Sequence, residues 1–229
     1  MERVHVLDHP AVADRLAGIR DARTPPALFR RLMEELGAFL AYEATRDLPT
    51  LTDEVTTPVG PAAVRRIAAG AVVAPVLRAG LGLLPGFLAV VESAVVAHLG
   101  FFRDPETLAA VPYYANIPED LAGRRVFVLD PMLATGHSAA AALGVLAERG
   151  AANTRVLAAI ATPEGIAHLL SAYPDVRIVT AALDPGLNEH GYIVPGLGDA
   201  GDRMFGSASS VPAGYRPGTA RGGTPERGA

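Results

Sequence analysis

The sequence predicts an α/β fold in which helices flank a mostly parallel β-sheet. Half of the 229 residues are hydrophobic, which is enough for one large core, and we expect a single main domain. From residue 71 onward, short apolar runs alternate with segments of helical periodicity. Apolar runs of this length are typical of parallel strands buried on both faces, joined by right-handed crossovers.

Two helices and a β-arm are predicted ahead of the sheet. Residues 10–45 form two amphipathic segments, with apolar residues at helical spacing, as at Val12, Leu16 and Ile19. Residues 51–60, LTDEVTTPVG, are rich in Thr and Val and are punctuated by Pro and Gly. This composition predicts an extended arm or hairpin on the surface.

Five apolar runs predict the strands of the sheet. They are AVVAPVL at 71–77, AVVAHLGF at 94–101, RVFVLD at 125–130, TRVLAAIAT at 154–162 and VRIVTAAL at 176–183. Because ligands collect at the carboxyl ends of parallel strands, the residues just after each run are candidates for a site. The last segment, 207–229, is small, polar and rich in Gly and Pro, and we expect it to be disordered.

Composition excludes several classes of function. The formal charge of −4 gives no broad basic surface, so we expect no nucleic-acid partner. There are no cysteines, and all 20 basic side chains are arginines, which excludes thiolate chemistry, Schiff bases and a P-loop lysine. The N-terminus lacks the apolar core of a signal peptide and no apolar run could span a bilayer, so we expect a cytoplasmic protein without a membrane partner.

The first candidate loop, residues 130–138, is called the phosphate loop below. Asp130 ends a predicted strand, PMLATGHS follows, and a helix is predicted from residue 139. Backbone N–H groups near Thr135 and Ser138 would open the helix and bind a phosphate. Asp130 would accept hydrogen bonds from sugar hydroxyls or help to hold a divalent metal. The alternative is an ordinary strand-to-helix turn, in which Asp130 only ends the strand.

The second candidate loop, residues 75–86, places Arg78 after an apolar run and beside two glycines. A guanidinium next to exposed amides suits a second anion, and Arg103, at the end of the next strand, could bind the same group. The alternative is that both arginines are solvated charges at strand ends.

The third candidate loop, residues 184–206, is called the hood loop below. Its six glycines and two prolines lie in a segment too apolar for a linker, so its backbone is expected to line a pocket. Such a backbone can present paired donors and acceptors to a flat, amide-like ring. Asp199 and Asp202 are the acids in its closing part.

These segments together resemble the uracil phosphoribosyltransferase family. The likeness is carried by LRAGLG, VLDPMLATGHSA, TPEGIAHL and LNEHGYIVPGLGDAGDRMFG, and it runs from about Val4 to Ser207. The resemblance implies a type I phosphoribosyltransferase fold, with one domain over 1–206, the 51–60 arm, a flexible cover at 102–121 and a small hood at 184–206. One departure is His137, which stands where the family has a second glycine in ATGGS, so its ring must point away from the site or over it.

The resemblance also implies an activity, transfer of a phosphoribosyl group from 5-phosphoribosyl 1-pyrophosphate (PRPP) to uracil, giving UMP and pyrophosphate. Four residues would be catalytic: Arg78, Arg103, Asp130 and Asp199. The PRPP site would comprise Arg78, Arg103, Asp130, Pro131, Met132, Leu133, Ala134, Thr135, Gly136, His137, Ser138 and Asp199. The uracil edge would be bound at Ile193, Gly198, Asp199 and Ala200.

The implied cofactor is Mg²⁺, held mainly by the substrate's pyrophosphate and not by a cage of protein ligands. A homodimer or higher homo-oligomer is expected, and activation by GTP is left open. Two alternatives also remain open at this stage. One is a regulator that uses the same fold to bind RNA, and the other is a transferase for a different base, which should differ at residues 191–203.

Overall fold

A computed structural model of the chain describes residues 3–68, 70–103 and 110–206. Its helical elements are α1 (Pro10–Arg20), α2 (Pro26–Ala44), the short 3₁₀ turn η1 (Ala79–Gly82), α3 (Leu84–Val90), α4 (His137–Ala147), α5 (Pro163–Ala172) and α6 (Ala200–Phe205). Its strands are β1 (Val4–Val6), β2 (Thr50–Thr57), β3 (Gly60–Ile67), β4 (Ala71–Leu77), β5 (Val95–Val96), β6 (His98–Arg103), β7 (Ala110–Asn116), β8 (Arg125–Leu129), β9 (Met132–Leu133), β10 (Asn153–Ala161), β11 (Arg177–Leu183), β12 (Gly186–Leu187) and β13 (Ile193–Val194).

The main sheet confirms the predicted α/β class. Its strand order is β1-β11-β10-β8-β4-β6-β7, and the pairs are parallel except for β7, which runs antiparallel to β6. The run predicted at 71–77 coincides with β4, whereas the run at 94–101 divides into the short β5 and β6. The sequence did not predict β1, whose three residues are too few to show a pattern.

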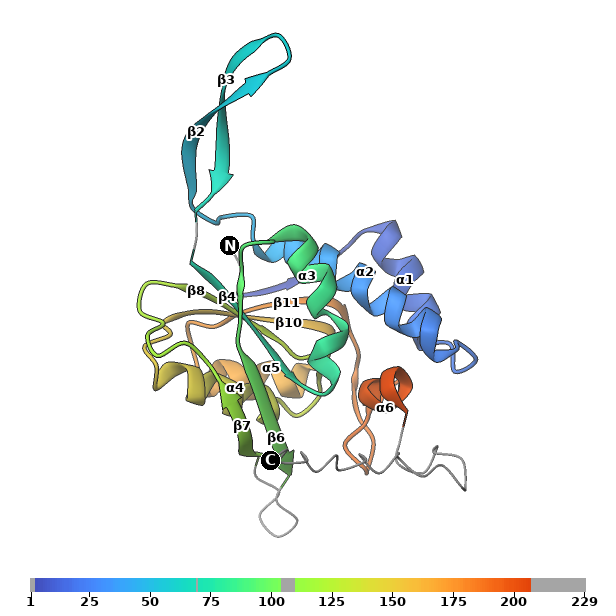
Figure 1. The fold of residues 1–229 in the computed structure, drawn as a ribbon. Helices are drawn as coiled ribbons and strands as arrows, with labels where there is room; N and C mark the ends of the chain where they lie inside the picture. The colour runs from blue at the N-terminus through green and yellow to red at the C-terminus, as the bar shows by residue number, and fades with distance from the viewer. Residues whose placement is uncertain (1–2, 69, 104–109, 207–229) are drawn as a thin grey trace, which may run out of the picture.

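Helices cover both faces of this sheet, as Figure 1 shows. Helices α1, α2, α3 and α6 pack on one face, where Val73 of β4 and Phe127 of β8 are buried. Helices α4 and α5 pack on the other face, against Val72 and Val128 from the same two strands. Adjacent residues of a strand therefore enter opposite cores, which is why these strands read as continuous apolar runs.

The arm is a hairpin of β2 and β3 that projects away from the domain (Figure 1). It extends from residue 50 to residue 67, beyond the predicted 51–60, because β3 carries Pro61 and two arginines and gives a weak strand signal. The tip residue Val59 is 97% exposed. The predicted cover at 102–121 contains β7, and its residues 104–109 lie outside the described part, as do 207–229.

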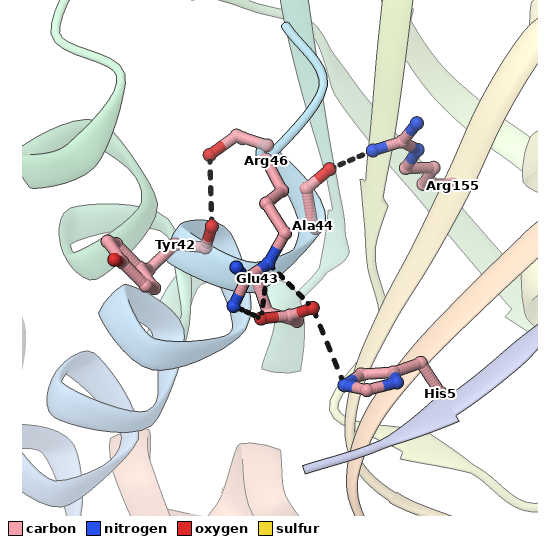
Figure 2. A network of polar contacts seen from close by, with 7 residues as sticks. His5, Tyr42, Glu43, Ala44, Arg46 and Arg155 are labelled. Atoms are coloured by element: carbon pink, nitrogen blue, oxygen red, sulfur yellow. Dashed lines mark hydrogen bonds and ion pairs between the residues drawn. The ribbon is translucent and has the colours of Figure 1, made fainter. Parts of the chain in front are cut away.

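Hydrogen bonds join the end of α2 to the amino end of the central strand β10, on the side of the sheet opposite the candidate loops. Figure 2 shows the buried Arg155 of β10 donating to the carbonyl of Ala44. Arg155 also donates to Asp47 Oδ2 at 2.7 Å, and this bond lowers the pKa of Asp47 to about 2. Nearby, Glu43 accepts from Arg46 at 2.7 Å and lies 3.5 Å from His5. These contacts fix α2 against the sheet. Helices α3 and α6 in turn pack on α2.

Candidate active site

The carboxyl end of β8 places Asp130 in a buried position at the start of the phosphate loop. Asp130 is 9% exposed, and its Oδ1 accepts a long hydrogen bond, 3.4 Å, from the backbone N–H of Met132. Burial raises the pKa of Asp130 to about 6. Because a buried carboxylate is costly without a cation or several donors, this side chain is suited to a ligand that supplies hydroxyl groups or positive charge.

Helix α4 begins at His137, two residues before the predicted start at residue 139, so the phosphate loop ends in its first turn. Gly136 precedes the helix with φ +81°, a left-handed conformation that glycine adopts without strain. A Cβ at Gly136 would lie 2.8 Å from the carbonyl oxygen of Gly165 in α5. A Cβ at Gly165 would lie 2.4 Å from the carbonyl oxygen of Ala134. The loop therefore lies in direct backbone contact with the start of α5.

His137, the residue that departs from the family pattern, contacts α5. Its ring lies 4.6 Å from the ring of His168, centroid to centroid, and its Nδ1 lies 2.8 Å from Thr135 Oγ1. This contact between His137 and His168 was not predicted, because the two residues are far apart along the chain and no motif joins them. The contact with His168 places the ring beside α5, which is the arrangement that points away from the site.

Arg78 follows β4, after a cis peptide bond that joins it to Leu77. Its Nη2 lies 2.8 Å from Asp202 Oδ1 in α6, and both side chains are about half exposed. Its neighbour Gly80 allows the chain to pass close to β8, because a Cβ there would lie 2.4 Å from the carbonyl oxygen of Leu129. Arg103 ends β6, which pairs with β4, but its side chain lies outside the described part.

The hood loop folds back over the same edge of the sheet through β12, β13 and α6. Asp199 caps α6, because its Oδ1 accepts from the backbone N–H of Asp202 at 2.8 Å. Ile193 is buried at the end of the loop's short hairpin, and Gly198 has φ +81°. The loop is anchored to the core by the buried side chains of Ile193, Leu197 and Met204.

All three loops line one cavity of about 330 Å³, a size that suits a small molecule. The sequence-predicted residues on its wall are Arg78, Asp130, Met132, Ala134, Ser138, Ile193, Gly198, Asp199 and Ala200. Other predicted residues of the phosphate loop do not line it: Pro131, Leu133, Thr135, Gly136 and His137. Leu133 is fully buried in the core, and the carbonyl of Pro131 accepts from β10.

The cavity also has wall residues that the sequence did not single out. Gly191 and Tyr192 line it from the hood loop, and Gly201 lines it from α6. The LNEHGY motif contains the first two, so membership of that motif was the one available signal. A larger cavity, of about 720 Å³, lies beside β1 and α2 and has mostly apolar walls. It contains none of the predicted site residues.

Metal and membrane features are absent from the part of the chain that the structure describes. Within residues 3–68, 70–103 and 110–206, no three acidic or histidine side chains converge as a metal cage. Over the same residues, no helix combines the length and the apolar character needed to cross a bilayer.

Comparison with known proteins identifies the family. The family model for uracil phosphoribosyltransferase matches residues 6–207. The chain belongs to the uracil phosphoribosyltransferase family. Membership confirms the family resemblance that the motifs indicated. It also confirms the enzyme class, a phosphoribosyltransferase that acts on uracil. The matched region contains all three loops and the hairpin.

Individual relatives of the uracil phosphoribosyltransferase family agree with this assignment. The uracil phosphoribosyltransferases of Caulobacter sp. and Shouchella clausii are 52% and 50% identical to the chain over 208 residues, which is 90% of this chain and 100% of each relative. A solved structure of a protein from Aquifex aeolicus is 38% identical, covers 89% of this chain and 98% of its own, and has a TM-score of 0.84.

The fold is shared more widely than the family. An adenine phosphoribosyltransferase from Leishmania donovani has a TM-score of 0.54 at 14% identity, covering 83% of this chain and 88% of its own. At that identity the likeness concerns the fold alone. It confirms the type I phosphoribosyltransferase fold expected from the sequence.

Proposed function

We propose that this chain transfers the 5-phosphoribosyl group of PRPP to N1 of uracil, giving UMP and pyrophosphate, as a step of pyrimidine salvage. The observation that carries the proposal is the convergence of Asp130, Arg78 and the hood-loop backbone on one cavity, in a chain of this family. The helix start, the carboxylate and the guanidinium have the chemistry to bind phosphate, ribose and pyrophosphate respectively.

In the proposed complex, the ribose 5-phosphate lies at the start of α4. The phosphate accepts from the N–H groups of the loop that ends at Ser138, and the ribose hydroxyls donate to Asp130. Arg78 and Arg103 bind the pyrophosphate. To bind the pyrophosphate, Arg78 must either leave its present partner Asp202 or bind both at once. Uracil then lies against the backbone at Ile193 and at residues 198–200.

The chemical step is displacement of pyrophosphate by uracil N1 through an oxocarbenium-like transition state. The loops hold N1 and the anomeric carbon in line, and the arginines stabilise the charge that develops on the leaving group. Asp199 already uses Oδ1 to cap α6, so we assign it to positioning and not to proton removal. A uracil bound as its anion would need no base.

Mg²⁺ is the proposed cofactor, held mainly by the pyrophosphate. The buried Asp130, with its raised pKa, fits a nearby cation, because a cation would favour its ionised form. When bound, the metal would neutralise part of the charge on the leaving group. The protein's own contribution is the arrangement of Asp130, Arg78 and the phosphate loop around that charge.

We also propose a homodimer or higher homo-oligomer and a cytoplasmic location. An isolated two-stranded hairpin is marginally stable in water, so the projecting β2–β3 arm is better explained by contact with a second copy. A phosphorylated sugar as substrate suits a cytoplasmic enzyme. GTP activation, which the resemblance leaves open, is tested by adding GTP to the assay below.

The test is pyrophosphate release from PRPP with uracil, cytosine, hypoxanthine and orotate compared. We expect uracil-dependent formation of UMP that requires Mg²⁺. Turnover with another base and none with uracil would refute the proposal and favour a different transferase. Tight, salt-sensitive binding of pyrimidine leader RNA on a filter would instead favour a regulator.

A further inference from the structure

An ion pair outside the cavity joins the end of α1 to the start of the hood loop. Arg20, the last residue of α1, donates to both carboxylate oxygens of Asp184, from Nη1 at 2.8 Å and from Nη2 at 2.6 Å. Asp184 follows β11 and is 4% exposed. Although burial alone would raise the pKa of Asp184, its hydrogen bonds from Arg20 and Gly196 lower it. The carboxylate is therefore ionised, and both of its oxygens accept hydrogen bonds.

Both members of this pair also hold the backbone of Gly196. The N–H of Gly196 donates to Asp184 Oδ2 at 2.9 Å, and Arg20 Nη1 donates to the carbonyl oxygen of Gly196 at 2.9 Å. Gly196 has φ +59°, and a Cβ there would lie 2.1 Å from the carbonyl oxygen of Ile193. The ion pair thus fixes the tight turn between Ile193 and Gly198, two residues of the cavity wall.

A second arginine holds the next residue of the turn to the same end of α1. Arg203 donates to the carbonyl of Leu197 at 2.8 Å, to that of Asp21 at 2.6 Å, and to that of Ile19. Its guanidinium lies 4.3 Å from the ring centroid of Phe29. The carbonyls at the end of α1 carry the negative end of the helix dipole, which favours a cation at this point.

We propose that Arg20 and Asp184 are positioning residues for the acceptor base, acting through the main chain of residues 193–200. Neither side chain lines the cavity. A base edge that is read by backbone groups requires a backbone held in one place, and β13 is only two residues long. The paired side chains supply the rigidity that a longer strand or helix would provide. The inference rests on the proposed function, because it takes uracil as the ligand of this wall.

The first experiment compares substitutions of Arg20 in the full-length protein. Arg20→Lys keeps the charge but loses the planar fork, so it cannot bind both oxygens of Asp184 and the Gly196 carbonyl together. We expect Arg20→Lys to raise KM for uracil about tenfold, the effect of losing one hydrogen bond to a charged group, and to change KM for PRPP less than about twofold. Asp184→Asn should act in the same direction, and the double variant should show less than the product of the two effects.

The matched control is Arg23→Lys. Arg23 lies just beyond α1, its side chain is 90% exposed, and its hydrogen bonds go to Asp21, as close as 2.8 Å, and not to the hood loop. We expect this control to leave both KM values and the melting temperature unchanged. Hydrogen exchange gives a readout that needs no substrate. Arg20→Lys should accelerate amide exchange across residues 193–200 and leave β4 and β10 unchanged.

Any of three results would overturn the inference. If Arg20→Lys raised the KM of both substrates equally, or only lowered the melting temperature, the ion pair would be structural and would have no role in base binding. Unchanged exchange at 193–200 would show that the turn does not depend on the pair. If the wild-type protein formed no UMP, the proposed function would fail, and hydrogen exchange would still decide whether this ion pair fixes the turn.

Discussion

At the scale of single residues, Asp130 combines a place on the cavity wall with an environment that is unfavourable for its charge. It lies at the carboxyl end of a central strand, where burial raises its pKa to about 6 from the ordinary 3.8. The folded protein therefore binds this proton more tightly than the unfolded chain. The stabilisation from that proton is complete below about pH 4 and is lost as the pH rises through 6.

Asp130→Asn should consequently stabilise the free protein and inactivate it. The substitution removes the cost of a buried charge, which is up to about 3 kcal/mol at pH 7 for a shift of this size. In urea unfolding at pH 7, we expect the variant to have a higher free energy of unfolding than the parent. This difference in free energy should vanish toward pH 4. Activity should fall by about 10²-fold or more. Equal stability of the two proteins at pH 7 would contradict the assigned environment.

The same ionisation predicts how the activity of the parent depends on pH. Asp130 must be a carboxylate to accept the ribose hydroxyls, so kcat/KM for PRPP should fall as the pH drops below about 6. A pH–rate profile measured at saturating uracil checks this. A flat profile between pH 5 and 7 would show that Asp130 stays ionised throughout or is not required.

At the scale of elements, the phosphate loop depends on a helix that does not touch the cavity. Gly136 and Gly165 pack backbone to backbone, and Thr162, which caps α5, also donates to the carbonyl of Ala134 at 2.6 Å. The loop that is proposed to bind phosphate is therefore held between α4 and the start of α5. Sequence periodicity predicted the helix of the phosphate loop but gave no sign of this contact.

Gly165→Ala should weaken donor binding from outside the cavity. The new Cβ would lie 2.4 Å from the Ala134 carbonyl, so the loop or α5 must shift. We expect KM for PRPP to rise about tenfold, a typical cost of one overpacked backbone contact, with KM for uracil little changed.

Gly144→Ala is the matched control for that substitution. Gly144 lies in the middle of α4, and its added Cβ would meet the movable hydroxyl of Tyr173 at 3.2 Å. Alanine is the better helix former, so we expect unchanged kinetics and equal or slightly higher stability. An unchanged KM for PRPP in Gly165→Ala would show that the phosphate loop does not need this packing.

At the scale of the whole molecule, the β2–β3 arm projects from the domain with apolar side chains in solvent. Leu51 is 62% exposed and Val59 is 97% exposed, while most of the large apolar residues that the structure describes are buried in the two cores. Such an arm is expected to find its stability in contact with another copy.

Replacing both Leu51 and Val59 with Asp should therefore reduce the proposed oligomer to a smaller species. Light scattering after size exclusion would measure the mass, and circular dichroism would confirm that the domain stays folded. Because the arm lies outside both cores, we expect the melting temperature of the domain to change only through loss of the partner. Unchanged mass would show that the arm does not hold two copies together.

Apolar runs and motifs were sufficient to predict the class of fold, the four central strands β4, β8, β10 and β11, and the family. The central strands are buried on both faces, so their apolar runs were visible without any partner, and the loop motifs carried the resemblance to the family. Local signals also placed Asp130, Arg78 and the hood loop at strand ends.

The contacts that hold those loops in place are visible only in the folded structure. The pairs Arg20–Asp184, His137–His168 and Gly136–Gly165 join residues far apart in the chain, and no periodicity or motif relates their positions. The predicted hairpin was too short because β3, with Pro61 and two arginines, lacks the alternation of a packed strand. A residue's chemistry can be read from its type and its local sequence, whereas its partners depend on the packing of distant segments.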